Sequence, residues 1–535
     1  MGLNNLLVIG ALLSLTSSIA LRWFSTDSSP IVDLDYAKYR GKYDCTTNTT
    51  DFLGIRYAAA PIGPARWRAP SAPKPESRTI SATSQPPICL QGWGGGLHVI
   101  EPEISSSEDC LFLNIFAPGR FKGSVTEHAK LPILVYIHGG GYALGGAGYP
   151  FLDPRHIIAE SGGRVLAVVI QYRLGVFGFL SGSDVQADGV SNAGLLDQRF
   201  ALQWVHQHIS KFGGDPDHVT VWGQSAGAGS VAHQLLAGDE LAGKSLFNAA
   251  ILSSLYLPPA YEFNDPIIES VYTGVLRNSG CAAHPRPLDC LRSMDASIKS
   301  AAEMDVSSKR LHGTFTFQPV VDNTFVIQRP SEVLAQRRML TKRLYAITNE
   351  LEGAIFVTPD VVAKTSMAEY IHGLFLNLTP VAIGKAVDMY AAVDSPLGKA
   401  AAIMGEAIFD CPTYMFMRAF EAPYKAKFAV PTAVHGSDMH YYFPGAFGAP
   451  PTYDNELFAR AFVGSFIDFI LNKDFDVPAS SSITPAWAAW EAESQIEMLF
   501  SRTANYQPLV RPVKTDDALM ERCRFWSSVA SDAGQ

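Results

Sequence analysis

The chain has 535 residues, 47% of them hydrophobic, and a formal net charge of -9. Its length exceeds that of a typical single domain, yet no linker, low-complexity tract or internal repeat interrupts residues 40–520, so we expect one large domain over residues 21–535. The acidic balance and the lack of clustered Lys and Arg argue against a nucleic-acid partner and favour a small molecule.

The N-terminus has the pattern of a secretory signal peptide. An apolar run over residues 6–15 is followed by small residues up to Ala20, which predicts a signal peptide over residues 1–20 with cleavage after Ala20. No Lys or Arg precedes Arg22, so an uncleaved, membrane-associated start is the alternative. No later segment offers about 20 continuous apolar residues, so no stable membrane insertion is expected. In a secreted protein, the sequons at Asn48 and Asn377 would be glycosylation sites.

Seven cysteines in a secreted chain predict disulfides with one cysteine left over. By spacing, the candidate pairs are Cys89–Cys110, Cys281–Cys290 and Cys411–Cys523, with Cys45 unpaired. Spacing alone does not fix this connectivity. No two cysteines have the close spacing of a zinc site, so neither a metal nor another cofactor is expected.

Short apolar runs alternate with helix-patterned stretches along the chain. Residues 131–137 and 165–172 predict buried strands, residues 195–212 predict a helix, and residues 219–222 predict a further strand. This alternation is typical of an α/β fold with a mostly parallel sheet, in which catalytic groups gather in the loops at the strand ends.

A glycine triplet follows the first of these strands, in the segment His138-Gly139-Gly140-Gly141-Tyr142. Such a loop exposes backbone N–H groups that can stabilise the oxyanion of a tetrahedral intermediate. We expect Gly140 and Gly141 to be two of these donors and Ala226, further along the chain, to be the third. The alternative is a tight loop that only requires positive φ.

The segment Gly223-Gln224-Ser225-Ala226-Gly227 lies between the strand over residues 219–222 and a helix predicted over residues 228–236. This pattern predicts a nucleophile elbow, in which a serine on a strained strand-to-helix turn exposes its hydroxyl. The chemistry indicated is acyl transfer, with Ser225 as the nucleophile. An ordinary glycine-rich turn is the alternative.

Several blocks of the sequence resemble the type-B carboxylesterase family, the cholinesterase-like branch of the α/β-hydrolases. They are Phe52-Leu53-Gly54-Ile55-Arg56-Tyr57-Ala58, Ser107-Glu108-Asp109-Cys110-Leu111-Phe112-Leu113-Asn114, Tyr172-Arg173-Leu174-Gly175 with Phe179, and the long stretch from Asn192 to Gly227. The resemblance covers most of the chain from about residue 35 onward. It implies the α/β-hydrolase fold, with a large, mostly parallel central sheet flanked by helices.

The resemblance also implies the other members of a catalytic triad. The acid of the family lies in a motif that here is Asn349-Glu350-Leu351-Glu352-Gly353, which implies Glu352 as the acid and leaves Glu350 as a rival. The histidine of the family matches His435, which implies that His435 is the general base. The order nucleophile, acid, base along the chain is that of the hydrolase fold. His138, His233 and His440 are interpreted as structural.

The three cysteine pairs given above also match the pattern of the family, and Cys45 falls outside it, so a buried free thiol is expected there. Gln224 stands where cholinesterases carry a glutamate, and Trp93 is displaced from the position of their choline-binding tryptophan. Choline esters are therefore not expected as substrates. The loop between Cys89 and Cys110 is shorter than the lid of interfacial lipases in the family. Arg56 stands where this block of the family usually has proline, and we assign it no function.

The sequence thus predicts a serine carboxylesterase that acts on a small-molecule ester through an acyl-enzyme intermediate. Enzymatic alternatives are a tailoring esterase or lactonase of a specialised-metabolite pathway and a triacylglycerol lipase. The non-enzymatic alternative is a binding or adhesion protein, which the intact triad disfavours. The pockets for the acyl and alcohol groups come from scattered loops, so the sequence leaves the ester itself open.

Overall fold

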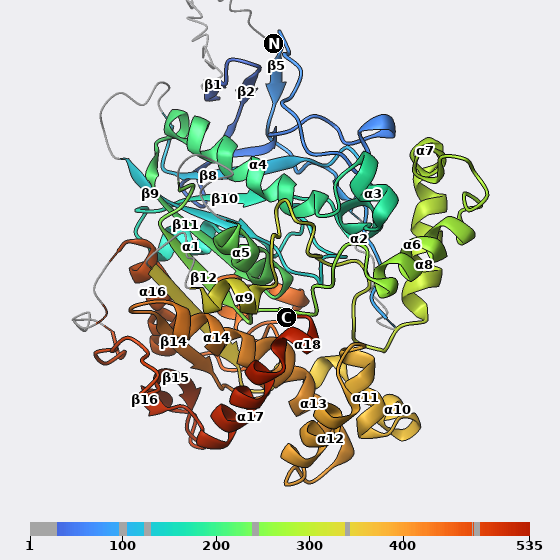
Figure 1. Ribbon diagram of the computed structural model, residues 1–535. Coiled ribbons are helices and arrows are strands. Elements are labelled where there is room, and N and C mark those ends of the chain that lie inside the picture. The colour runs from blue at the N-terminus through green and yellow to red at the C-terminus, as the bar shows by residue number, and fades with distance from the viewer. Residues whose placement is uncertain are drawn as a thin grey trace, which may run out of the picture.

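The structure is a computed structural model of the chain (Figure 1). It describes residues 29–95, 104–121, 130–237, 245–336, 343–472, 475 and 482–535. The predicted signal peptide, residues 1–20, lies outside these ranges.

An 11-stranded sheet runs through the centre in the order β16-β15-β14-β13-β12-β11-β9-β10-β8-β4-β3. Strands β10 to β15 pair in parallel, and antiparallel strands complete both edges. The strands are β3 Lys42–Asp44, β4 Thr49–Arg56, β8 Phe112–Pro118, β9 Leu131–Ile137, β10 Leu166–Ile170, β11 Gly214–Gln224, β12 Ala249–Ser253, β13 Arg343–Asn349, β14 Tyr424–Phe428, β15 Ile496–Arg502 and β16 Pro508–Lys514. A second sheet joins β1 Ile31–Asp33, β2 Lys38–Arg40 and β5 Thr79–Ser81, and β6 Ile88–Cys89 pairs with β7 Ser106–Ser107.

Strand β9 shows why the central strands read as continuous apolar runs. Ile133 and Val135 point into one hydrophobic core, while Leu134 and Tyr136 point into a second core on the opposite face. A strand that is buried on both faces has no polar side, so the alternation of polar and apolar residues disappears. The predicted α/β architecture is confirmed.

Helices cover both faces of the sheet. Residues of α4 and α5 belong to the first core, and residues of α1 and α16 belong to the second. Figure 1 shows α6 to α8 and α10 to α13 beside the sheet rather than over it. No helix in the described ranges is both long and apolar enough to cross a membrane. The helices are α1 Arg155–Glu160, α2 Gly175–Phe179, α3 Ser183–Asp188, α4 Ala193–His208, α5 Ala226–Leu236, α6 Pro266–Asn278, α7 Pro287–Ser293, α8 Ala296–Ser308, α9 Pro330–Ala335, α10 Pro359–Lys364, α11 Met367–Leu374, α12 Pro380–Met389, α13 Pro396–Gly405, α14 Cys411–Ala419, α15 Met439–Tyr442, α16 Glu456–Ile470, α17 Asp517–Ser528 and α18 Ala530–Ala533.

The predicted elements differ from the observed ones mainly at their ends. The helix predicted over residues 195–212 begins earlier, at Ala193, and ends at His208, after which Ile209–Phe212 tighten into a 3-10 turn. The helix predicted from Ala228 begins at Ala226, directly after Ser225. Strand β11 extends to Gln224, so strand and helix meet at Ser225 itself.

Three disulfides are present, Cys89–Cys110, Cys281–Cys290 and Cys411–Cys523. The last of these fastens α17, near the C-terminus, to α14. The expectation for Cys45 was wrong, because its free thiol is exposed rather than buried. Cys45 directly follows β3, the short strand at one edge of the central sheet.

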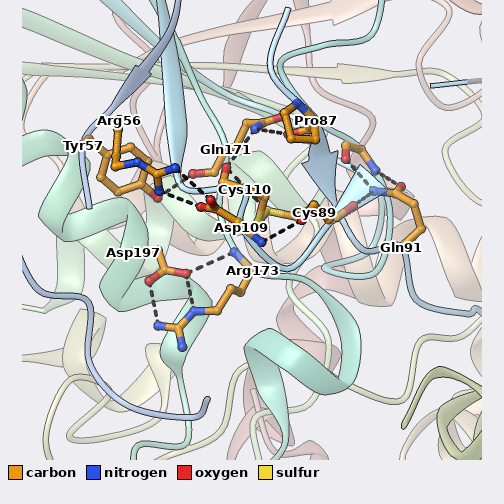
Figure 2. Close-up of a disulfide and its surroundings, with 12 residues drawn as sticks. Arg56, Tyr57, Pro87, Cys89, Gln91, Asp109, Cys110, Gln171, Arg173 and Asp197 are labelled. Atoms are coloured by element: carbon orange, nitrogen blue, oxygen red, sulfur yellow. Dashed lines mark hydrogen bonds and ion pairs between the residues drawn. A yellow bond between two sulfur atoms is a disulfide. The ribbon is translucent and has the colours of Figure 1, made fainter. Parts of the chain in front are cut away.

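The disulfide between Cys89 and Cys110 is tied to the sheet by Gln171, as Figure 2 shows. The Gln171 side-chain amide donates to the carbonyl oxygens of Cys110 at 2.8 Å and of Pro87 at 3.0 Å. The Gln171 carbonyl in turn accepts a 2.7 Å hydrogen bond from the Tyr57 hydroxyl. Residues that are far apart in the sequence therefore converge at this disulfide.

Two arginine–aspartate pairs hold the same region together (Figure 2). Arg173 contacts Asp197 through two 2.7 Å hydrogen bonds, and both side chains are almost fully buried. Arg56 binds Asp109 in a bidentate pair at 2.6 and 2.8 Å and lies over the Phe112 ring. The arginine that replaces the usual proline thus joins two of the sequence blocks that carry the family resemblance.

Candidate active site

Ser225 occupies the turn between β11 and α5. Its backbone has φ 57° and ψ -125°, a left-handed conformation that is unusual for a residue with a side chain and marks a strained turn. Gly227 permits this turn, because a Cβ at that position would collide with the carbonyl oxygen of Ile137 on β9. The elbow geometry expected from the sequence is therefore present, with Ser225 largely buried.

The glycine loop after β9 lies against Ser225. Strands β9 and β11 are parallel neighbours, and a Cβ built on Gly139 would lie 3.0 Å from the Ser225 Cβ. Gly140 and Gly141 both have positive φ, and their N–H groups have no recorded acceptor among the described residues. Ala226 is the first residue of α5, where backbone N–H groups lack partners within the helix. The glycine loop and the start of α5, which bear the three predicted oxyanion donors, thus both adjoin the serine turn.

Glu352 and His435 meet in the loops that follow β13 and β14. The Glu352 Oε2 lies 2.6 Å from His435 Nδ1, and both side chains are buried. The other carboxylate oxygen of Glu352 accepts a 2.6 Å hydrogen bond from the backbone N–H of Asn349. Because β13 and β14 are adjacent parallel strands, their carboxyl ends bring the two loops together.

The second ring nitrogen of His435 faces the serine turn. The side-chain amide of Gln224 lies 3.4 Å from His435 Nε2. With Nδ1–H donated to Glu352, Nε2 carries the lone pair and accepts from Gln224. Among the described residues, no hydrogen bond joins the Ser225 hydroxyl to the His435 ring. Such catalytic contacts commonly tighten only when substrate binds.

A buried polar network that the sequence did not reveal joins the same loops. The Asn349 side chain donates to Asp438 Oδ1 and to the Ser254 hydroxyl, each at 3.0 Å. The other Asp438 oxygen accepts from the Tyr442 hydroxyl. Burial raises the pKa of Asp438 to about 6, with the nearby Glu352 carboxylate adding to the rise. Asn349 begins the motif quoted for Glu352, and Asp438 lies three residues after His435, which was the available signal.

Two aromatic rings also contact His435. The Phe409 and Phe356 rings lie 4.7 and 5.2 Å from the imidazole and stack on each other. Phe409 is presented by a π-helical turn, Glu406–Asp410, a local irregularity that is frequent at functional sites. The rings exclude water from the imidazole and from its bond to Glu352.

The remaining histidines singled out in the sequence lie outside this arrangement. His138 is buried, stacks on Tyr172 and contacts the Gly139 carbonyl, and burial lowers its pKa to about 4. Burial likewise lowers the pKa of His233 to about 4. His440 contacts the Ala449 carbonyl. These contacts fit the structural roles predicted for them.

The two sequons are accessible. Asn48 and Asn377 are both exposed. The Asn48 side chain accepts a hydrogen bond from the Tyr43 hydroxyl, and the Asn377 side chain donates to Asp265 at 3.3 Å. Neither contact covers the side chain, so both sites could carry a glycan.

A buried glutamate lies beneath the loop that begins at Cys89. Glu303 of α8 accepts a 3.3 Å hydrogen bond from the Trp93 backbone N–H, and its other oxygen has no hydrogen-bond partner in the described structure. The side chain is inaccessible to solvent, and this burial raises its pKa to about 8. The described start of the loop is thus fixed to α8, while residues 96–103 lie outside the described ranges.

The raised pKa of Glu303 predicts a pH-dependent stability. Folded Glu303 holds its proton more tightly than the unfolded residue, whose pKa is near 4.5. The contribution of Glu303 to the free energy of unfolding is therefore complete below pH 4.5 and is lost as the pH rises through 8. Glu303→Gln cannot ionise, so its stability relative to wild type should increase by at least about 1 kcal/mol between pH 5 and pH 8.5. Thermal unfolding at both pH values measures this change, with the exposed Glu456→Gln as control. Parallel pH curves for Glu303→Gln and wild type would contradict it.

Comparison with known proteins agrees with this geometry. The carboxylesterase family model matches residues 28–526. The chain is 32% identical to carboxylesterase 1E of Rattus norvegicus over 79% of this chain and 81% of that protein. It is 34% identical to secreted lipase 1 of Botryotinia fuckeliana over 62% of this chain, spanning 61% of the lipase's length.

The fold also matches solved structures. The crystal structure of Aspergillus niger EstA superposes with a TM-score of 0.82 at 27% identity and covers 96% of this chain and 100% of EstA. The predicted α/β-hydrolase fold and the predicted family are thereby confirmed. The chain belongs to the carboxylesterase family, whose members compared here are carboxylic ester hydrolases.

Proposed function

We propose that the protein is a serine carboxylesterase in which Ser225 is the nucleophile, His435 the general base and Glu352 the acid that orients it. The observation that carries the proposal is the buried 2.6 Å contact between Glu352 and His435, with the other ring nitrogen, Nε2, 3.4 Å from the side-chain amide of Gln224, the residue before Ser225. This arrangement of nucleophile, base and orienting carboxylate is recognised by geometry.

In the acylation step, His435 Nε2 takes the hydroxyl proton of Ser225 while Ser225 Oγ bonds to the ester carbonyl carbon. The carbonyl electron pair moves onto its oxygen, and the N–H groups of Gly140, Gly141 and Ala226 stabilise that negative charge. Glu352 stabilises the imidazolium through Nδ1–H and holds the ring in the required tautomer. The intermediate collapses when the imidazolium gives its proton to the departing alcohol.

Water then completes the cycle. His435 removes a proton from water, the resulting hydroxide attacks the acyl-enzyme, and the proton returns to Ser225 Oγ as the carboxylic acid leaves. No metal or other cofactor is needed for either half of this proposal. Gln224 beside the nucleophile carries no charge, which supports neutral esters rather than choline esters as substrates.

We also propose that the protein is secreted after cleavage of residues 1–20 and is glycosylated at Asn48 and Asn377. Three disulfides are typical of an oxidising compartment. One relative is named a secreted lipase. The exposure of both asparagines supports glycan attachment.

Lipase action is the second candidate, because lipases are among the relatives. We expect hydrolysis of soluble neutral esters such as 4-nitrophenyl butanoate, with rates that follow one saturation curve across the solubility limit. The loop between Cys89 and Cys110 encloses only 20 residues, fewer than the lid of interfacial lipases in the family, which supports this expectation. The measurement is the initial rate for esters of graded acyl length below and above their solubility limits. A sharp rise above the limit would identify a lipase, and the absence of hydrolysis for every ester would favour a binding protein.

A further inference from the structure

A small hollow, with about 70 Å³ of space for the centres of water-sized molecules, lies beside the sheet between α6, α11 and the segment around Phe315. Its walls are mainly apolar or aromatic, as is usual for sites that bind small organic molecules. Wall residues include Tyr256, Ile268, Leu374, Met404 and Ile408. None of the residues assigned above to the triad or to the oxyanion donors lines it.

The wall that faces the candidate active site is one side chain thick. The Phe315 ring packs directly on Gly141, where a Cβ would collide with it. The backbone N–H of Tyr256 donates to the carbonyl oxygen of Ser225 at 3.3 Å, and its ring lies 5.5 Å from Phe409, which contacts His435. Phe315 and Tyr256, which both line the hollow, therefore separate it from the serine turn.

The hollow contains an arginine side chain that has no partner among the described residues. Arg310 lines it half-buried, and among the described residues its guanidinium makes neither an ion pair nor a hydrogen bond. Burial lowers its pKa, and its ordinary value of 12.5 is high enough for the group to stay charged.

A second polar group in the same wall is also unsatisfied. The Thr316 hydroxyl is buried and has no hydrogen-bond partner in the described part of the chain. Buried polar groups are nearly always hydrogen-bonded in proteins, so two polar side chains without partners among the described residues of one hollow indicate a missing polar ligand. A carboxylate would suit the guanidinium, because it can accept two hydrogen bonds from arginine.

We propose that the hollow binds the far end of the substrate and that Arg310 selects esters bearing an anionic group there. The substrate class would be half-esters of dicarboxylic acids, or esters of hydroxy acids, in which an apolar spacer separates the ester from a carboxylate. This inference rests on the proposed esterase function. Arg310 is a specificity-determining residue and takes no part in the bond-breaking steps.

The test compares matched anionic and neutral esters on Arg310→Met. Mono-4-nitrophenyl glutarate against 4-nitrophenyl pentanoate places the charge on the acyl side, and 4-acetoxybutanoate against butyl acetate places it on the alcohol side. We expect kcat/KM for one anionic ester to fall about 10- to 100-fold, the usual effect of losing a hydrogen bond to a charged group. The neutral ester of the same pair should keep its kcat/KM, which also shows that the variant folds.

Lys309→Met is the matched control, because Lys309 precedes Arg310 and pairs with Asp305 on the surface. It removes the same charge and should leave both esters unchanged, while Arg310→Lys should restore part of the anionic activity. Equal effects of Arg310→Met on anionic and neutral esters, or none on either, would overturn the inference. A wild-type protein that hydrolyses no neutral ester would instead refute the proposed esterase function.

Discussion

Replacement of Ser225 by alanine is expected to lower kcat for ester hydrolysis by at least about 10,000-fold, with the protein still folded. Alanine removes the oxygen that forms the acyl-enzyme, so only the oxyanion donors and substrate binding remain to assist attack by water. Alanine keeps the Cβ atom of serine, so packing around the strained turn at φ 57° should not change. The measurement is steady-state hydrolysis of a soluble neutral ester, with thermal unfolding to verify the fold.

Ser254 provides a stringent control for this substitution. It follows β12, the strand next to β11, and like Ser225 it has a positive φ. Its hydroxyl accepts a hydrogen bond from Asn349 rather than facing His435. Ser254→Ala should therefore lose a structural hydrogen bond and keep its turnover. Full esterase activity in Ser225→Ala, or a complete loss of activity in Ser254→Ala alone, would show that another residue is the nucleophile.

Replacement of Glu352 by glutamine is expected to reduce kcat by about 1,000- to 10,000-fold while substrate binding changes little. Glutamine has nearly the same shape but can offer its NH₂ group to His435 Nδ1. The imidazole would then carry its proton on Nε2 and could not accept the proton of Ser225. The uncharged amide would also fail to stabilise the imidazolium. Measurement of kcat and KM across pH 6 to 9 separates this loss from a change in binding.

Glu350 supplies the matched control, because it is the rival carboxylate of the same loop. Its side chain is 44% exposed and pairs with Lys427 at 3.0 Å. An exposed pair of this kind contributes less than about 1 kcal/mol to stability. Glu350→Gln should therefore leave kcat within error of wild type. A larger loss of kcat in Glu350→Gln than in Glu352→Gln would show that Glu350, rather than Glu352, is the acid of the triad.

The sequence predicted the architecture well because burial on both faces leaves a plain signal. Strand β9 and the strand that leads to Ser225 are continuous apolar runs, and the glycines around Ser225 mark the sharp turn between strand and helix. The meeting of Glu352 with His435, in contrast, was implied only by the family resemblance. Nothing local in either motif reveals that β13 and β14 are neighbours in the sheet.

Features that depend on contacts across the fold could not be predicted. The Asn349 side chain joins Ser254 to Asp438, three segments that only the sheet brings together. The π-helical turn that places Phe409 on His435 has no composition signal. Cys45 was expected to be buried because free cysteines usually are, but it lies beside an edge strand. Only the structure shows that Arg310 has no acidic partner among the described residues.

The central claim is that Ser225 forms the covalent intermediate. The most direct measurement is mass spectrometry of the wild-type protein after reaction with an organophosphate, first intact and then as peptides. The proposed mechanism predicts one added phosphoryl group per chain, located on Ser225 and absent from Ser225→Ala. Inactivation that coincides with labelling of a different serine, or with no covalent adduct, would contradict it.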